Sequence, residues 1–315
     1  MKRAIWTTLL TVVLMAGFAV GSCASEMNDA VAVKNAELAM ATGDFNKAVS
    51  ILNEVEQTPI TEAYLRFCDT WNVSEEDNAF EKTKVYKESD IGKMVEINDA
   101  FVYFPNEVNE GTRYLVYYAG GGGGWLLRQD YAWNYCNKFE PNAICVFFKA
   151  SGLGNIGQMQ ERTGIILKSA AYLTGIHPYK VTIISSSNGG YMTFYAAVYL
   201  YNTFSIVTDR ICSLDMGLNW SKLDVLISED EAQPLVTMQT KVYAFGRHDE
   251  IWSLLGAKQF EGYGVPLYEV ACVNGDHERM TKIAFRNGTF SWAIGQIRDL
   301  DPWEYKITPV NFGES

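Results

Sequence analysis

Short apolar runs alternate with helix-like stretches from about residue 93 to about residue 297, and this alternation constrains the fold more than any other feature. The runs are rich in Val, Ile, Tyr and Phe, as strands buried on both faces should be. Seven runs are predicted as strands: Lys93–Phe104, Arg113–Ala119, Ala143–Lys149, Lys180–Ser185, Arg210–Leu214, Lys241–Phe245 and Pro266–Val273. Five stretches are predicted as helices: Leu126–Phe139, Gly157–Thr174, Gly189–Tyr201, Ile251–Glu261 and Glu278–Ile297. The alternation predicts an α/β fold, a mainly parallel sheet with helices on both faces.

The first 22 residues have the features of a secretory signal peptide. Lys2 and Arg3 precede an uncharged and mostly apolar stretch, Ala4–Val20, that is marginally short for a membrane-spanning helix. Small residues directly before Cys23 resemble the lipobox of bacterial lipoproteins, in which the cysteine carries lipid and becomes the new N-terminus. We therefore expect an exported protein, anchored through Cys23 on the outer face of a bacterial cell membrane. Cleavage after Ala24 with free secretion, or an uncleaved anchor, are the alternatives.

The charge and the cysteines exclude several kinds of partner. The chain carries 26 Lys and Arg against 37 Asp and Glu, a formal net charge of −11, which disfavours binding to nucleic acid. No two cysteines have the spacing of metal ligands and the three histidines are scattered, so no metal is expected. The run Gly120–Gly124 lacks the Gly-Lys-Ser/Thr ending of a phosphate loop, and no other cofactor is expected. We expect buried, inert thiols in the three strand-like runs that contain Cys145, Cys212 and Cys272.

The chain is expected to divide into residues 23–90, a helical leader with an acidic linker, and residues 91–315, the α/β domain. Asn35–Glu56 is alanine-rich and helical in pattern, with one break at 42–44. The residues from Gly43 to Pro59 resemble part of one tetratricopeptide repeat, but no second copy follows, and a single repeat cannot bury its own face. We expect a helical hairpin that packs on the main domain or spaces it from a membrane. A peptide-binding role is the alternative.

A serine-rich turn follows the run Lys180–Ser185, at the end of a strand where open parallel sheets bind their ligands. The residues Ser185 to Gly190 read small-x-Ser-x-small-Gly and lead into a helical stretch. This pattern resembles the nucleophile elbow of the α/β-hydrolase family, with Ser185 in place of the usual first glycine. The resemblance implies that Ser187 is a nucleophile at a helix N-terminus, where the helix dipole favours negative charge. An ordinary tight turn is the alternative.

Five consecutive glycines, Gly120–Gly124, follow the run Arg113–Ala119. This loop resembles the oxyanion loop of esterases and lipases, although Ala119 stands where a histidine often opens it. Glycines allow backbone N–H groups to approach a substrate oxygen without hindrance from side chains. The resemblance implies an oxyanion hole. Its expected backbone donors are Gly121, Gly122, Gly123 and Asn188.

Two later strand ends carry an acid and a base. A Gly-x-x-Asp motif ends at Asp249, and a Gly-x-His motif ends at His277. The order Ser187, Asp249, His277 matches the family's order of nucleophile, acid and base. Asp215, which follows the run Arg210–Leu214, is the alternative acid, because some family members place the acid one strand earlier.

The chain has three histidines, and we expect the other two to lie outside the triad. His177 precedes a proline and is expected in a surface turn, whereas His248 adjoins the predicted acid and is expected to point away from Ser187. Three further residues follow strand ends and are candidates to line the pocket, the alternative being a place in the core or at the rim: Trp125, Met216 and Trp252. The longest candidate for a lid is the segment Gly217–Met238.

The family resemblance implies an eight-stranded sheet and a serine hydrolase that cleaves an ester, or else a thioester or amide, through an acyl-enzyme. A small-molecule carboxylic ester is the favoured substrate, and a peptide or a carbohydrate acetyl ester is the alternative. A different class of function also stays open. The chain would then be a non-catalytic surface lipoprotein that uses the fold as a binding scaffold.

Overall fold

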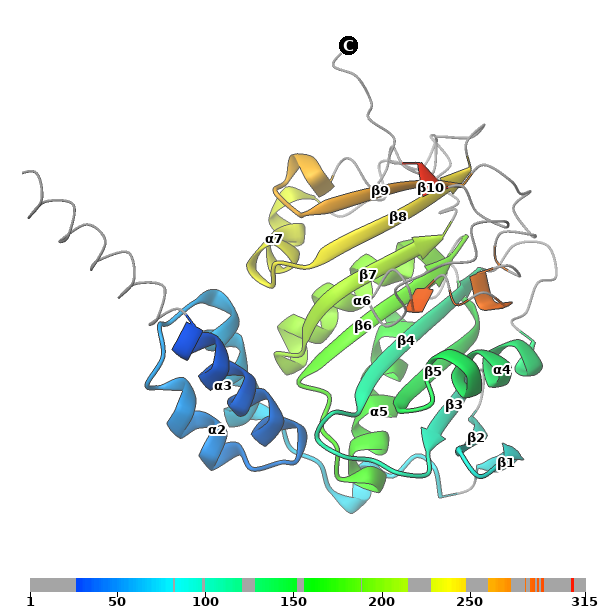
Figure 1. Cartoon of the computed structure of the whole chain (residues 1–315), viewed down its shortest axis with the longest axis horizontal. Coiled ribbons are helices and arrows are strands. Elements are labelled where there is room, and N and C mark those ends of the chain that lie inside the picture. Colours follow the sequence, from blue (N-terminus) through cyan, green and yellow to red (C-terminus); the bar gives the residue numbers. More distant parts are fainter. Residues whose placement is uncertain are drawn as a thin grey trace, which may run out of the picture.

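The computed structural model describes residues 27–81, 83–97, 100–120, 128–151, 156–187, 189–214, 228–247 and 260–272, with short pieces at 281, 284–286, 288, 290–291 and 307–308. Ten strands form one sheet: β1 (Lys84–Glu88), β2 (Gly92–Ile97), β3 (Ala100–Pro105), β4 (Arg113–Gly120), β5 (Ala143–Ser151), β6 (Lys180–Ser186), β7 (Val207–Leu214), β8 (Lys241–Arg247), β9 (Leu267–Cys272) and β10 (Ile307–Thr308). Their order across the sheet is β1-β2-β3-β5-β4-β6-β7-β8-β9-β10 (Figure 1).

The six strands from β5 to β9 in this order are parallel to one another. Strands β1, β2 and β3 extend the sheet antiparallel on one side, and β10 pairs antiparallel with β9 on the other. Because parallel strands end at the same edge, the segments that follow β4, β6, β7, β8 and β9 all leave the sheet at one edge, which we call the carboxyl edge. The mainly parallel sheet confirms the predicted α/β class, and the architecture is consistent with an α/β-hydrolase fold.

One local prediction was wrong. The run Lys93–Phe104 is not one strand but two, β2 and β3, which pair with each other down to Ile97 and Ala100. Apolar residues continue through both strands, so the sequence pattern did not show where the first strand ends and the second begins. Strands β2 to β9 form the expected eight-stranded sheet, and the short strands β1 and β10 extend its two edges to ten.

Helices cover both faces of the sheet (Figure 1). Helix α4 (Gln129–Phe139) packs on one face with the described residues of 284–290, and α5 (Ile156–Thr174) and α6 (Gly189–Phe204) pack on the other. The segment expected as a lid contains a further helix, α7 (Glu229–Thr237), which packs against α6 and buries Ala232 and Leu235 in the core. That half of the segment therefore belongs to the core, and residues 217–227 lie outside the described residues.

The leader is a set of three helices that begins before the sheet. It consists of the helix over residues 27–41, α2 (Phe45–Leu52) and α3 (Pro59–Thr70), followed by the short 3-10 helix η1 (Glu75–Asp77). Gly43 has a φ of 77° in the turn between the first two helices, a conformation that favours glycine, and Asp44 caps α2 through the backbone N–H of Lys47. The buried apolar residues of the leader belong to the same core cluster as those of the sheet domain.

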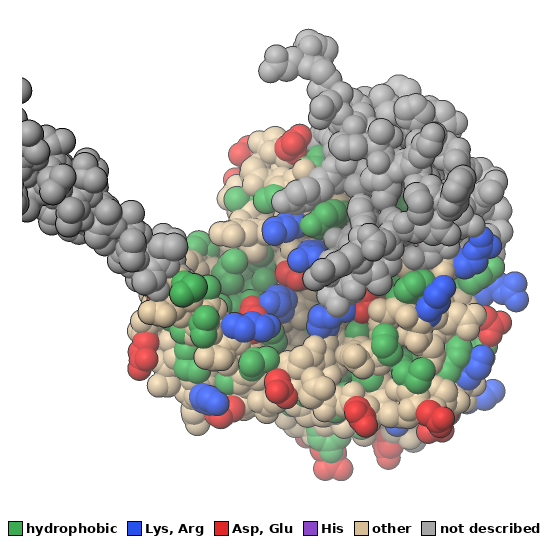
Figure 2. Space-filling view, viewed as in Figure 1, with side chains coloured by type: hydrophobic (Ala, Val, Ile, Leu, Met, Phe, Trp, Pro, Cys, Tyr) green, Lys and Arg blue, Asp and Glu red, His purple; other side chains and the backbone are tan. Residues whose placement is uncertain are grey.

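The leader meets the sheet domain at the amino ends of β6 and β7, away from the carboxyl edge (Figure 1). Lys and Arg side chains gather in the hollow between the two parts (Figure 2). Across the junction, the ammonium of Lys180 contacts the carboxylate of Glu37 at 2.5 Å, and Tyr64 donates a hydrogen bond to the same carboxylate at 2.9 Å. No helix within the described residues is long and apolar enough to cross a membrane.

The prediction for His177 was wrong. Its side chain is not in a free surface turn but half-buried in the junction, where the indole N–H of Trp71 donates to its Nδ1 at 2.9 Å. The Pro178 that follows it suggested a turn, and the sequence held no signal that the leader would cover that turn. His177 is therefore part of the contact between the leader and the sheet domain.

A pair of matched leucines on α5 tests the packing of the core. Leu167 is fully buried, whereas Leu173 is 48% exposed on the same helix. We expect Leu167→Ala to lower the free energy of unfolding by about 2–5 kcal/mol, because it removes buried methyl groups and leaves a cavity. Leu173→Ala should change it by less than about 0.5 kcal/mol. Urea unfolding followed by circular dichroism measures both, and equal effects would contradict the packing described here.

Candidate functional site

The carboxyl edge is described at the last residues of its strands, and Ser187 is the predicted site residue that falls within the described part. The other predicted site residues lie outside it: Gly121, Gly122, Gly123, Trp125, Asn188, Asp215, Met216, His248, Asp249, Trp252, His277 and the lipidation candidate Cys23. For these residues the structure fixes the strands that lead to them. Asp249 follows β8 by two residues, and His277 follows β9 by five.

Ser187 occupies a sharp turn between β6 and α6. Its φ is 52°, in the left-handed region that residues other than glycine rarely adopt. Its N–H donates to the carbonyl of Leu214 at the end of β7 at 2.9 Å, and its carbonyl accepts from the N–H of Gly190 at 3.0 Å. Such a conformation persists only where the surrounding structure holds it, and it is common at functional sites. The strand–turn–helix context is the one that the elbow motif requires.

Two glycines make room for this turn. A Cβ added to Gly189 would lie 2.1 Å from the carbonyl oxygen of Tyr118, so the start of α6 lies directly against the backbone of β4. A Cβ added to Gly120 would lie 2.6 Å from the Cβ of Ser187 and 3.1 Å from its Oγ. The first glycine of the Gly120–Gly124 run therefore lies against the predicted nucleophile. The sequence pattern pointed to this run but did not single out Gly120.

The residues before Ser187 are small because they are enclosed by neighbouring strands. Ser185 is fully buried and donates to the hydroxyl of Ser213 on β7 at 3.1 Å, which explains how serine replaces the usual glycine of the elbow. The hydroxyl of Ser186 lies 2.6 Å from that of Tyr117 on β4. Burial raises the pKa of Tyr117, so its phenol stays neutral. These two contacts join the end of β6 to both of its neighbouring strands. No local sequence pattern pointed to Tyr117 or Ser213.

Helix α6 makes a rigid support for the turn. Most of its side chains are buried between the sheet, α5 and α7, and Phe194 stacks on Phe260 with ring centroids 4.0 Å apart. The N-terminus of the helix points toward the carboxyl edge, where its dipole favours negative charge on a reacting group. The arrangement places a serine hydroxyl at the end of a buried strand and beside a helix N-terminus.

Three of the thiols that the structure describes are buried, and the fourth, Cys68, is half-buried. Cys145 on β5 and Cys212 on β7 are fully buried, as predicted for both, and burial raises the pKa of the Cys212 thiol. The side chain of Cys272 lies outside the described residues. Within the described ranges, no group of three or more His, Cys, Asp or Glu side chains could hold a metal ion.

Comparisons with known proteins find similar solved structures but no matching family. No protein-family model and no curated protein matches the chain. Carboxyl esterase 2 of the fungus Tuber melanosporum is 13% identical, with 76% of this chain and 98% of that chain covered and a TM-score of 0.43. A thermostable carboxylesterase cloned from a metagenomic library is 14% identical over 69% of this chain and 88% of that chain, with a TM-score of 0.44.

A hyperthermophilic esterase of the archaeon Pyrobaculum calidifontis is 14% identical, with 68% of this chain and 83% of that chain covered and a TM-score of 0.43. At identities of 13–14% and TM-scores below 0.5, these likenesses do not assign an activity to this chain. The function of this chain is therefore inferred from the local geometry around Ser187.

Two glycines at the starts of helices test the close approach of α6 to β4. We expect Gly189→Ala to lower the free energy of unfolding by at least about 1–3 kcal/mol, because the new methyl group would overlap the Tyr118 carbonyl. Gly157→Ala, at the start of α5, meets open space and should leave stability unchanged or raise it by about 0.4–1 kcal/mol. Thermal and urea unfolding measure the two changes. A neutral Gly189→Ala variant would contradict this geometry.

Proposed function

We propose that this chain is a serine hydrolase of the α/β-hydrolase superfamily that cleaves a carboxylic ester through an acyl-enzyme on Ser187. The observation that carries the proposal is the left-handed backbone of Ser187 between β6 and α6, with Gly120 and Gly189 packed closely around the turn. An ordinary tight turn would have little need for a serine in this conformation, because glycine adopts it without strain.

We propose His277 as the base and Asp249 as the acid. The strands β6, β7, β8 and β9 are consecutive in the sheet, with Ser186 opposite Leu214, Leu214 opposite Phe245 and Phe245 opposite Val270. Ser187 is thus three strand spacings, about 14 Å, from β9. His277 lies five residues beyond Cys272, a step that spans up to roughly 17 Å when extended. The chain is therefore long enough for His277 to approach Ser187.

The proposed reaction follows acyl transfer. His277 would accept the proton of the Ser187 hydroxyl while Oγ bonds to the ester carbonyl carbon, and Asp249 would orient the imidazole and stabilise its charged form. The tetrahedral oxyanion would accept hydrogen bonds from backbone N–H groups among Gly121–Gly123 and from Asn188. The bond to the alcohol oxygen then breaks, and His277 returns the proton to the leaving alcohol. Water repeats the sequence on the acyl-enzyme and releases the acid.

The substrate and the location belong to the same proposal. We propose a small-molecule ester as substrate, because Trp125, Met216 and Trp252 follow strand ends at the carboxyl edge and would give an apolar pocket. We also propose that the chain is exported and held at the outer face of a bacterial membrane through lipid on Cys23. The leader meets the sheet domain at the amino ends of β6 and β7, so the leader itself does not cover the carboxyl edge.

Labelling by a fluorophosphonate probe tests the nucleophile. We expect the wild type to react at one serine, and Ser187→Ala to abolish the reaction and to lower ester hydrolysis by at least about a thousandfold. Ser186→Ala is the matched control, because its hydroxyl is bonded to Tyr117, and it should still react. Protein mass spectrometry with peptide mapping reads both. A folded wild type that does not react supports the scaffold function instead.

Single variants test the base and the acid. We expect His277→Gln and Asp249→Asn each to lower kcat for a p-nitrophenyl ester by about 10³-fold or more. His248→Gln and Asp215→Asn are the matched controls and should retain most of the activity. If Asp215→Asn is the inactive acid variant and Asp249→Asn is active, the acid follows β7 and the assignment made here is wrong.

Metabolic labelling with palmitate tests the anchor. We expect the wild type produced in a bacterial host to incorporate palmitate and to fractionate with membranes, and Cys23→Ala to lose both properties. Cys68→Ala is the control and should remain labelled. A wild type that is recovered unlabelled from the medium would contradict the lipid anchor without bearing on the hydrolase.

A further inference from the structure

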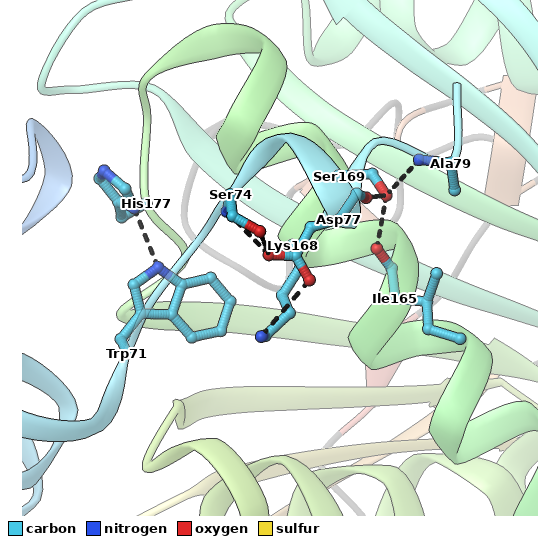
Figure 3. A network of polar contacts seen from close by, with 8 residues as sticks. All are labelled: Trp71, Ser74, Asp77, Ala79, Ile165, Lys168, Ser169 and His177. Atoms are coloured by element: carbon cyan, nitrogen blue, oxygen red, sulfur yellow. Dashed lines mark hydrogen bonds and ion pairs between the residues drawn. The ribbon is translucent and has the colours of Figure 1, made fainter. Parts of the chain in front are cut away.

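The junction between the leader and the sheet domain is centred on one histidine ring. The backbone N–H of His177 donates to the carbonyl of Ala41 at the end of the first leader helix, at 2.8 Å. The indole N–H of Trp71, which follows α3, donates to Nδ1 of the same residue at 2.9 Å (Figure 3). An Nδ1 that accepts a hydrogen bond carries no proton. This contact therefore requires a neutral imidazole.

The surroundings of the ring favour the neutral form. A Cβ added to Gly43 would lie 2.7 Å from Nε2, so the imidazole lies directly against the backbone of the leader turn. The ring centroid of Phe45 is 5.2 Å from that of His177, and Trp71 in turn stacks on Phe67 at 5.2 Å. Burial in this aromatic setting lowers the pKa of His177 below its ordinary value.

Some of the charged side chains on the leader helices, η1, α5 and β6, the elements around the ring, have partners of their own. Asp44 caps α2, Arg66 of α3 donates to the Tyr201 hydroxyl, and Lys168 of α5 pairs with Asp77 at 3.5 Å while lying 6.0 Å from the Trp71 ring. The remaining charged residues on these elements are Asp29, Lys34, Glu37, Lys47, Glu62, Asp69, Glu75, Glu76, Glu161, Arg162 and Lys180. Burial is the cause that lowers the pKa of His177, so the junction has no built-in compensation for an imidazolium.

We propose that His177 is an acid-sensitive latch that holds the leader on the sheet domain. Protonation of Nδ1 removes the acceptor used by Trp71 and leaves the indole N–H facing another donor. It also places a positive charge among aromatic rings. His177 therefore binds a proton less tightly when the leader is docked than when it is released. This difference in proton affinity makes docking weaker at acidic pH.

The direction of the pH effect follows from the lowered pKa. Docking is at full strength above the ordinary histidine value of about 6.5. Below that pH a released leader gains a proton at His177 that the docked leader does not bind, so docking weakens until the pH reaches the lowered pKa. Below the lowered pKa both forms are protonated, and the dependence ends.

Glu37 titrates outside this window. Burial alone would raise the pKa of its carboxyl, but the charge of Lys180 and hydrogen bonds from Lys180 and Tyr64 hold it below its ordinary value. Its contribution to docking is therefore present above the ordinary glutamate value, about 4.3, and is lost only as the pH falls through the lowered pKa. The step between neutral and mildly acidic pH belongs to His177.

A second set of contacts stays in place when the latch opens. The Ser169 hydroxyl donates to the carbonyl of Asp77 and accepts from the N–H of Ala79, and Lys168 pairs with Asp77 (Figure 3). None of these contacts involves the imidazole of His177. The segment after Trp71 therefore remains fixed to α5, and we infer that residues 27–71 move as a unit about it.

Hydrogen exchange read by mass spectrometry tests the latch in the full chain. We expect exchange in peptides of residues 27–71, corrected for the intrinsic pH dependence of the chemistry, to rise severalfold between pH 7.5 and pH 5.5. Peptides of β4 and β6 should not change. The variant His177→Asn places an amide oxygen near the position of Nδ1, an acceptor that cannot be protonated, and should remove the rise. An unchanged wild-type leader, or an equal rise in His177→Asn, would overturn the proposal.

A second measurement tests the latch if His177→Asn does not fold. Nitrogen NMR of the imidazole rings in the wild type gives the titration of His177 directly, with His248→Gln used to assign the signals. The midpoint of the leader's exchange should fall between the titration midpoints of the docked and released forms, and the docked value should lie below about 6.5. Trp71→Phe should raise leader exchange already at pH 7.5. A His177 that titrates while leader exchange stays constant would contradict the latch.

Discussion

The left-handed backbone of Ser187 is the constraint on which the rest of the site depends. A residue other than glycine adopts this conformation at a cost in free energy, so its surroundings must hold it. Its N–H donates a hydrogen bond to the carbonyl of Leu214. Gly120, which has no side chain, lies against it, and Gly189 packs closely on the backbone of β4. Each contact comes from a different element. The position of one hydroxyl thus depends on how β4, β7 and α6 pack together.

The sequence predicted the parts of the fold whose signals are local. Alternating apolar runs and helical stretches gave the parallel strands and most helices, since a strand buried on both faces needs a continuous apolar run. The errors came where pairing decides the structure. The β2–β3 hairpin reads as one apolar run, and β1 is a charged edge strand that pairs with β2. The helix α7 was missed because its apolar residues are few.

In the candidate site, too, local sequence patterns revealed some features and missed the contacts between distant residues. Glycine and serine in a strand–helix turn indicated the elbow, because only small residues fit there. The contacts of Ser185 with Ser213 and of Ser186 with Tyr117 join strands that lie far apart in the chain, so no local pattern could reveal them. His177 was placed in a surface turn for the same reason: its partner Trp71 is 106 residues away. The leader is thereby tied to the turn that leads directly into β6, the strand that carries Ser187.

The central claim is that Ser187 forms a covalent acyl-enzyme. Mass spectrometry of the intact protein tests it directly. The protein is mixed with a p-nitrophenyl ester and quenched in acid within the first turnovers, and its mass is then measured. The account predicts a mass increase equal to the acyl group, formed together with a burst of p-nitrophenol and mapped to the peptide that contains Ser187. Hydrolysis that proceeds with no adduct, or an adduct on another residue, would contradict it.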